Sequence, residues 1–112
     1  MARTTVPAFP KTQNPAYRDP DYIDWCRGRF LHCQVPGCTE RANDPCHGRK
    51  AYPFGGGGGQ KSSDYSILME CRAHHAVETA PGGGYHAVWK PGERDKIVIH
   101  NLQLYIVEET GR

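Results

Sequence analysis

Two short pairs of metal-ligating side chains constrain this chain more than any other feature. Four residues separate Cys33 from Cys38, two separate Cys71 from His74, and 32 separate the two pairs. Each spacing lets two side chains reach one tetrahedral ion, and thiolates combined with an imidazole suit zinc. The alternative is that these are free thiols in a small core, where buried cysteines are common. The ordered spacing favours one structural Zn²⁺ held by all four side chains.

A bound metal would help a chain of this composition to fold. Only 38% of its 112 residues are hydrophobic, and it contains 13 glycines and 9 prolines, so the core of the expected single domain is small. The five cysteines are not spaced like a disulfide framework, and no segment resembles a signal peptide or a membrane span. We therefore expect a reducing, cytoplasmic compartment and no membrane partner. The net charge of +2 permits nucleic-acid binding without demonstrating it.

The order of the expected elements indicates an α+β fold. Residues 1–18 are polar and proline-rich and predict a flexible arm, and a helix follows in "DPDYIDWCRGRF", where Asp19 can cap it. A short strand or a loop exit is expected in "PCHGRK", a strand in "DYSILME" and a helix in "CRAHHAVETA". The runs "YHAVW" and "KIVIHNLQLYIV" predict two strands, with a helix as the alternative for the second.

Two histidines are left over once zinc has taken its ligands. Neighbouring side chains on a helix diverge by roughly 100°, so His75 should face away from the metal that His74 binds. His47 stands in "PCHGRK", beside Cys46, which is an alternative ligand for the zinc ion. Cys26 lies on the first predicted helix, where a packing role is expected. The second helix therefore points to two sites, one for each histidine.

This layout resembles the HNH endonuclease family, and within it the Rap-like recombination nucleases of phages. The matching pieces are "RDPDYIDWCRGRF", "CQVPGC", "PCHGRK", "GGGGGQKSSDY" and "CRAHH", in that order, which cover residues 18–79. The resemblance implies a small zinc-stapled ββα-metal domain over residues 19–80. The arm of residues 1–18 precedes this domain, and a β-rich extension, residues 81–112, packs on it.

The resemblance also implies roles for individual residues. His47 matches the general base, His75 matches a ligand of a catalytic Mg²⁺ or Mn²⁺, and Asp64 lies near the polar position that orients the base or ties down its loop. Cys46 stands where the family has a second cation ligand, although its thiol suits Mg²⁺ poorly. Thr79 stands where many relatives have another histidine, so Asp44 or Glu78 are alternative ligands.

The expected function is metal-dependent hydrolysis of DNA, on branched or recombination intermediates of a phage in the host cytoplasm. Arg49, Lys50, Lys61 and Arg72 would contact phosphates. A homodimer could form through an edge strand of the extension. The alternative is a non-catalytic, zinc-stabilised module that binds nucleic acid or protein. Such a module would not need the pair His47 and His75.

Overall fold

The computed structural model describes residues 18–48 and 62–111. Within these residues the fold is α+β, as expected, with four α-helices and a two-stranded sheet. The elements, in chain order, are α1 (Pro20–Arg29), β1 (Asp44–Cys46), the 3-10 helix η1 (Asp64–Ser66), β2 (Leu68–Glu70), α2 (Arg72–Thr79), α3 (Gly84–Val88) and α4 (Glu93–Thr110). Except for residue 18, the predicted arm lies outside the described residues, as does the five-glycine run.

Helix α1 begins where the sequence predicts. The Asp19 carboxylate accepts a hydrogen bond of 3.0 Å from the backbone N–H of Tyr22, and Pro20 occupies the first turn, because proline needs no hydrogen-bond partner there. Tyr22 and Cys26 are both buried. Four residues apart, they lie on one face of the helix, so the packing role expected for Cys26 is confirmed.

Strands β1 and β2 are short and antiparallel. Asp44 pairs with Glu70 and Cys46 pairs with Leu68. The strand predicted over residues 64–70 is only half correct, because its first half is η1, which Ser63 caps by accepting from the Tyr65 N–H. The predicted strand near Cys46 begins earlier than expected, at Asp44.

The β-rich extension predicted for residues 81–112 is wrong, because both runs are helical. The first run lies in α3 and the second lies in α4, for which a helix was the alternative. The buried residues of α4 recur at helical spacing, at Arg94, Val98, Asn101 and Tyr105. The edge strand expected to support a homodimer is therefore missing from the described part of this segment. No helix among the described residues, α4 included, is long and apolar enough to cross a membrane.

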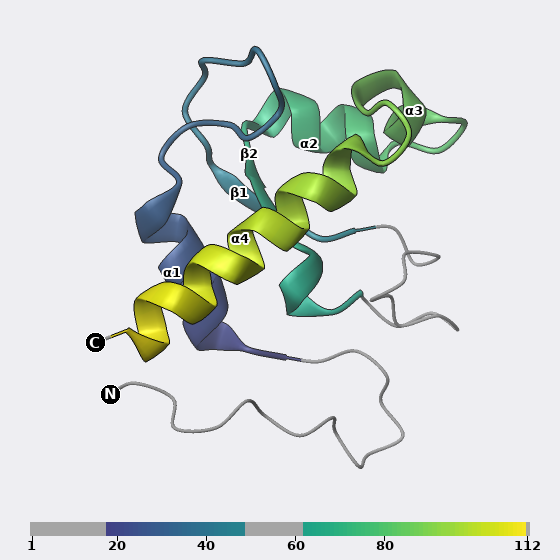
Figure 1. Ribbon diagram of the computed structural model, residues 1–112. Coiled ribbons are helices and arrows are strands. Elements are labelled where there is room, and N and C mark those ends of the chain that lie inside the picture. The colour runs from purple at the N-terminus through teal and green to yellow at the C-terminus, as the bar shows by residue number, and fades with distance from the viewer. Residues whose placement is uncertain (1–17, 49–61, 112) are drawn as a thin grey trace.

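Helix α4 runs across both halves of the core, beside α1 at one end and near α2 and α3 at the other (Figure 1). Of two buried clusters, the first contains Cys33, Val35, Leu68, Cys71, Tyr85, Trp89 and Val98. The second contains Tyr22, Cys26, Ile67, Met69 and Tyr105. Successive residues before and within β2 alternate between these clusters because strand side chains point to opposite faces. The short sheet thus separates the two clusters, and α4 contributes to both.

A pair of side-chain amides ties the sheet to α4. The Gln34 Nε2 donates to the Asn101 Oδ1, and the Asn101 Nδ2 donates to the Gln34 Oε1, both at 3.1 Å. The same Gln34 Oε1 accepts from the Met69 N–H at 2.9 Å. Since Asn101 is fully buried, these bonds satisfy polar groups that would otherwise be costly to bury.

Candidate metal centre and histidine sites

A tight turn presents the first two cysteines. The Cys38 N–H donates to the Val35 carbonyl at 3.0 Å, and the Cys33 N–H donates to the Glu40 carbonyl at 2.8 Å. Between them Gly37 has a φ of +83°, a left-handed conformation that glycine adopts without steric cost. The chain therefore reverses here with both thiols held on one side.

The start of α2 brings the other two ligands to the same place. Cys71 is the N-cap of α2, and the Nδ1 of His74 lies 3.4 Å from the Cys71 Sγ and 3.5 Å from the Cys33 Sγ. Ligand atoms of all four predicted residues, Cys38 included, lie within 4.8 Å of one another. Tetrahedral zinc with ordinary bond lengths separates a sulfur from a nitrogen by about 3.6 Å. The predicted set is thus assembled, and its geometry fits a metal ion such as zinc.

The thiols of this cluster differ in how readily they lose a proton. Burial raises the pKa of Cys33 to about 12. For Cys71 burial also acts upward, but hydrogen bonds from the His74 backbone and the thiols of Cys33 and Cys38 bring its pKa below the usual value. Metal ligation requires deprotonated thiols, so binding at this cluster should weaken in acid.

His75 faces a different group, as its position on the helix predicts. Its Nδ1 lies 3.0 Å from the Oδ2 of Asp44 on β1. Hydrogen bonds from His75 and then from Arg72 hold the pKa of Asp44 below its ordinary value, so this carboxylate is ionised at neutral pH. With Nδ1–H donating to Asp44, the ring presents Nε2 as a free acceptor. A carboxylate behind a histidine in this way is the usual support of a metal ligand.

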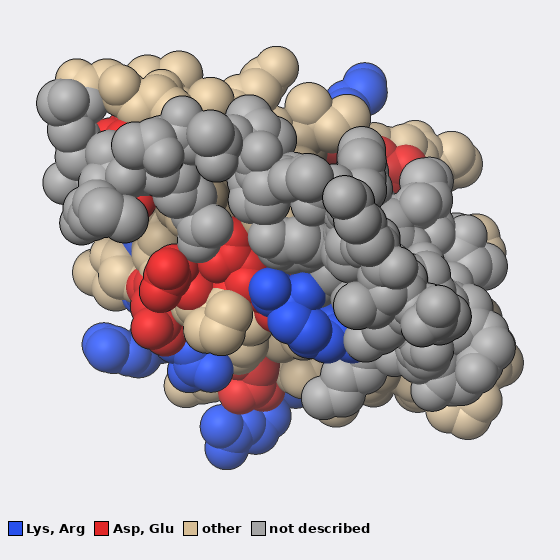
Figure 2. Space-filling model, turned by 90° about the horizontal axis from the view of Figure 1, so that it is seen from below, with Lys and Arg blue, Asp and Glu red and all other residues tan. Residues whose placement is uncertain are grey.

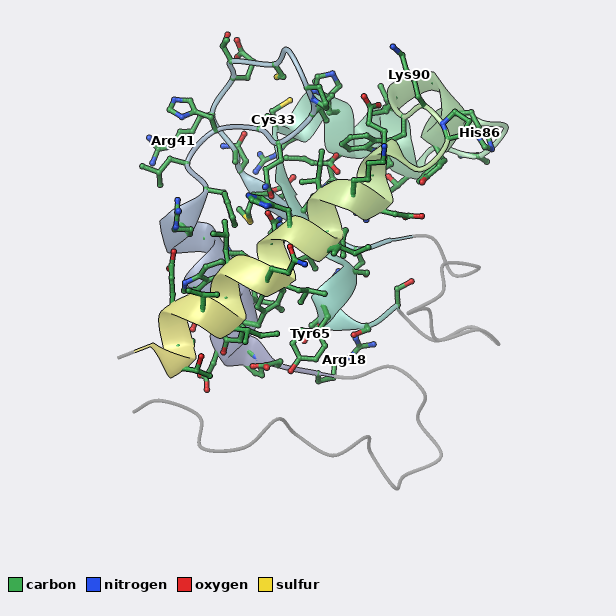
Figure 3. All side chains as sticks on the ribbon, in the orientation of Figure 1. Arg18, Cys33, Arg41, Tyr65, His86 and Lys90 are labelled. Atoms are coloured by element: carbon green, nitrogen blue, oxygen red, sulfur yellow. The ribbon has the colours of Figure 1, made fainter. Side chains whose placement is uncertain are left out.

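His47 has a carboxylate of its own. Its Nε2 lies 2.8 Å from the Oδ1 of Asp64, and its side chain is 26% exposed while that of Asp64 is 6% exposed. Asp64 also accepts from the backbone N–H of Asp19 at 2.7 Å and from the Arg18 guanidinium at 3.2 Å. Arg18 and Tyr65 lie together beside this site, far from Cys33 in the same view (Figure 3). The carboxylate is therefore fixed by two donors, Asp19 and Arg18, and holds one nitrogen of a partly exposed imidazole.

The backbone after His47 is anchored by two serines. The Gly48 N–H donates to the Ser66 Oγ at 2.9 Å, and the Ser62 Oγ donates to the Gly48 carbonyl at 2.7 Å. Both serines are buried. They join the exit of β1 to the segment around η1, so the imidazole of His47 sits on a restrained stretch of chain.

A cavity of about 530 Å³ opens beside His47. Its lining is His47, Gly48, Glu78, Thr79, Ala80, Gly83, Gly84, Tyr85 and His86. Part of this wall comes from α3 and the turn before it, which lie outside the resemblance. Thr79 supplies no carboxylate or imidazole here, and its hydroxyl donates to the His75 carbonyl at 2.8 Å.

Cys46 does not join His75, contrary to the expectation that the two could share a cation. Its thiol belongs to a buried group with Glu70 and Glu78, in which one ligand atom from each residue lies within 4.8 Å of the others. Burial raises the pKa of the Cys46 thiol, and burial together with the neighbouring Glu78 raises that of Glu70 to about 9. Cys46 is fully buried with these two glutamates, whereas Asp44, at the other end of the strand, has a partly exposed side chain and meets His75.

Sequence reasoning missed Arg94, the cation of this buried group. Its side chain is fully buried, and its Nε donates to the Glu78 Oε2 at 2.9 Å. Although burial acts to lower it, the nearby Glu78 carboxylate raises the pKa of Arg94 above its ordinary value. A single arginine in a polar turn resembles a solvated residue, so only the presence of two core glutamates could have pointed to it.

Three of the four predicted phosphate contacts, Arg49, Lys50 and Lys61, lie outside the described residues. Arg72 is described, with its side chain 78% exposed and its Nη2 3.4 Å from the Asp44 Oδ1. An exposed pair of this kind contributes little stability, so the guanidinium stays available to a phosphate. On the face shown in Figure 2, the visible acidic and basic side chains of described residues lie next to one another.

Comparisons with known proteins add no relative to this picture. No family model, no curated protein and no solved structure matches the chain.

Proposed function

We propose that the chain is a metal-dependent endonuclease of the HNH type that hydrolyses phosphodiester bonds of DNA. The observation that carries the proposal is the pair formed by His47, which lines the cavity, and the buried carboxylate of Asp64. A general base needs an acceptor nitrogen open to substrate and a partner that fixes the opposite nitrogen. Among the described histidines that line the cavity, His47 has such a carboxylate partner.

In this proposal each nitrogen of His47 has its own role. With Nε2–H donating to Asp64, Nδ1 is free to take a proton from a water molecule. The resulting hydroxide attacks phosphorus, the bond to the 3′ oxygen breaks, and that oxygen takes a proton from a water molecule, so the products carry 5′-phosphate and 3′-hydroxyl ends. The buried Asp64 carboxylate stabilises the imidazolium that forms and keeps the ring in position.

His75 is the proposed ligand of the catalytic cation, Mg²⁺ or Mn²⁺. Its Nε2 is the ligating atom, and Asp44 supports the ring from behind. When bound, the cation supplies positive charge to the crowded phosphate and to the leaving oxygen. Cys46 has no part in this site, because its thiol lies with the two buried glutamates.

Structural Zn²⁺ in the cysteine and histidine cluster would hold these parts together. Cys33 and Cys38 belong to the loop after α1, while Cys71 and His74 begin α2. His74 and His75 are consecutive, so the ion that fixes the first histidine also fixes the turn that carries the second. The resemblance to Rap-like phage nucleases suggests branched or recombination DNA as substrate, bound mainly through its phosphates.

A second candidate is a zinc-stabilised module that binds nucleic acid or protein without cutting. The observation that favours it is Thr79, which faces the cavity where a further cation ligand is expected. A cation held by His75 as the one imidazole ligand would bind weakly, and a chain that lost catalysis could keep its fold and its phosphate contacts.

Cleavage of supercoiled plasmid by zinc-loaded protein separates the two candidates. With Mg²⁺ or Mn²⁺ added, we expect nicking by the wild type, loss of nicking in His47→Ala, and retention in the control His100→Ala, which alters an exposed histidine on α4. DNA binding in a gel-shift assay without cutting in either ion would support the binding module. Loss of zinc or of the circular dichroism spectrum in His47→Ala would show that His47 is structural.

A further inference from the structure

The carboxyl group of Glu70, on β2, is buried in the interior of the protein. The side chain of Glu70 is fully buried, and neither of its oxygens has a hydrogen-bond partner among the described residues. Burying a carboxyl group unpaired is expensive, and native proteins keep such groups only where something compensates them. Glu70 therefore indicates a ligand in the space that its oxygens face.

Two other ligand atoms converge on the same space. The Cys46 Sγ from β1 and a carboxylate oxygen of Glu78 from α2 join an oxygen of Glu70 from β2, all within 4.8 Å of one another. Bonds of 2.0–2.3 Å to one ion give ligand atoms separations of this size. The three residues come from three packed elements and are each at least 96% buried, so the surrounding side chains hold each ligand in place.

The surroundings of Glu78 are those of a supported metal ligand. Trp89 Nε1 donates to the Glu78 Oε1 at 2.6 Å, and Arg94 Nε donates to the Oε2 at 2.9 Å. Arg94 in turn donates to the carbonyls of Ser66 and Cys46, both at 2.7 Å. The Oε1 keeps a second lone pair for an ion, while the Oε2 also accepts from the Cys46 thiol at 3.5 Å, a bond that ends when the thiol loses its proton to bind the ion. Outer hydrogen bonds such as those from Trp89 and Arg94 orient ligands.

Charge also fits a divalent ion. A thiolate and two carboxylates carry three negative charges, and Arg94 balances one of them. A divalent cation neutralises the remaining two, which makes the buried group electrically neutral as a whole. A single thiolate with two carboxylates suits a borderline ion such as Zn²⁺ and suits Mg²⁺ poorly.

We propose that Cys46, Glu70 and Glu78 form a second zinc site, separate from the cysteine and histidine cluster and from the histidine pair. Glu78 also lines the cavity beside His47, which gives an ion or a completing water molecule a route to the site. The site shares no ligand with the structural cluster and none with the proposed nuclease centre, so it stands whether or not the chain cuts DNA.

Zinc counting on the full chain tests the proposal. The protein is saturated with Zn²⁺, passed through a desalting column, and analysed for metal by mass spectrometry. We expect two tightly held ions per wild-type chain and one per chain in Glu70→Gln, which keeps the side-chain shape and removes the charge. Cys46→Ser should also hold one, whereas Cys26→Ser, which alters a buried thiol outside the site, should hold two.

His75→Ala separates this site from the nuclease centre, because it removes the proposed catalytic ligand and should leave the count at two. One ion per wild-type chain would overturn the second site. Two ions per chain in Glu70→Gln together with one ion per chain in His75→Ala would overturn it as well, because the second ion would then be bound by His75. Cobalt substitution of Glu70→Gln, read from its thiolate absorption bands, verifies that the first cluster remains loaded and folded.

Discussion

The Nε2 of His47 lies 2.8 Å from the Oδ1 of Asp64, a carboxylate that is itself held by the Asp19 N–H and by Arg18. We predict that Asp64→Asn slows plasmid cleavage by at least about 100-fold, because the ring loses the charge that stabilises its protonated form. The asparagine oxygen can still accept from Asp19, so the fold should persist. The measurement is the cleavage rate at saturating DNA together with DNA affinity, which should change little. An unchanged rate would remove Asp64 from the mechanism.

Removal of metal from the cysteine and histidine cluster should destabilise the whole domain. We predict that Cys33→Ser lowers the free energy of unfolding by at least about 3 kcal/mol, because a bound metal contributes directly to folding. Thermal melts with and without a chelator measure this, and the chelator should lower the wild-type Tm strongly and the variant Tm little. Cys26→Ser is the control and should remain chelator-sensitive. A chelator-insensitive wild type would show that the cluster holds no stabilising ion.

The hydrogen-bonded amides of Gln34 and Asn101 should contribute to the free energy of unfolding, because losing one of them leaves the other without its partner. Asn101→Ala leaves the half-buried Gln34 amide without a partner for its NH₂ group, and we predict a loss of about 1–3 kcal/mol in the free energy of unfolding. Urea denaturation measures the loss. Gln103→Ala on the exposed side of α4 is the matched control and should stay within about 0.5 kcal/mol of the wild type. Equal effects of the two variants would contradict the role of the pair.

Cys26 should make the protein less stable in alkali. Burial raises the pKa of its thiol from 9.0 to about 12, so the unfolded chain loses this proton at lower pH than the folded chain. The stabilisation is complete below pH 9 and is lost as the pH rises toward 12, by up to about 1.4 kcal/mol per pH unit. Urea denaturation of wild type and Cys26→Ala at pH 8 and pH 10 should show a steeper decline for the wild type. Parallel declines would refute the effect.

The sequence was informative wherever a local rule or a ligand spacing determined the structure. Asp19 and Pro20 predicted the start of α1, and the spacing of Cys33, Cys38, Cys71 and His74 predicted a set that the fold does assemble. The divergence of His74 and His75 also follows from helix geometry alone. The start of α1 depends on residues that are neighbours along the chain, and closely spaced cysteine and histidine residues commonly bind a metal.

The extension was misread because two of the buried positions in α4 are polar. Arg94 and Asn101 are buried in the core although a search for apolar residues would not count them, while the apolar residues Ile99, Ile106 and Val107 are exposed. Counting only apolar residues therefore hid the helical period and left a β-rich composition. For the same reason the sequence did not predict the buried group around Cys46. Charged residues can occupy a core only when a partner from a distant segment packs against them, and an apolar pattern does not reveal such a partner.

Helix α4 and the segment around β2 each contribute side chains to both buried clusters, and this has a consequence for motion. Opening one cluster exposes side chains that cover the other, so thermal fluctuations should release both in one cooperative event. Amide hydrogen exchange would then show similar protection for α1, β2 and α4. The carboxylates that hold His47 and His75 come from η1, which packs against α1 and α4, and from β1, which packs against α1 and β2. The distances at both histidines should therefore persist until the molecule unfolds as a unit.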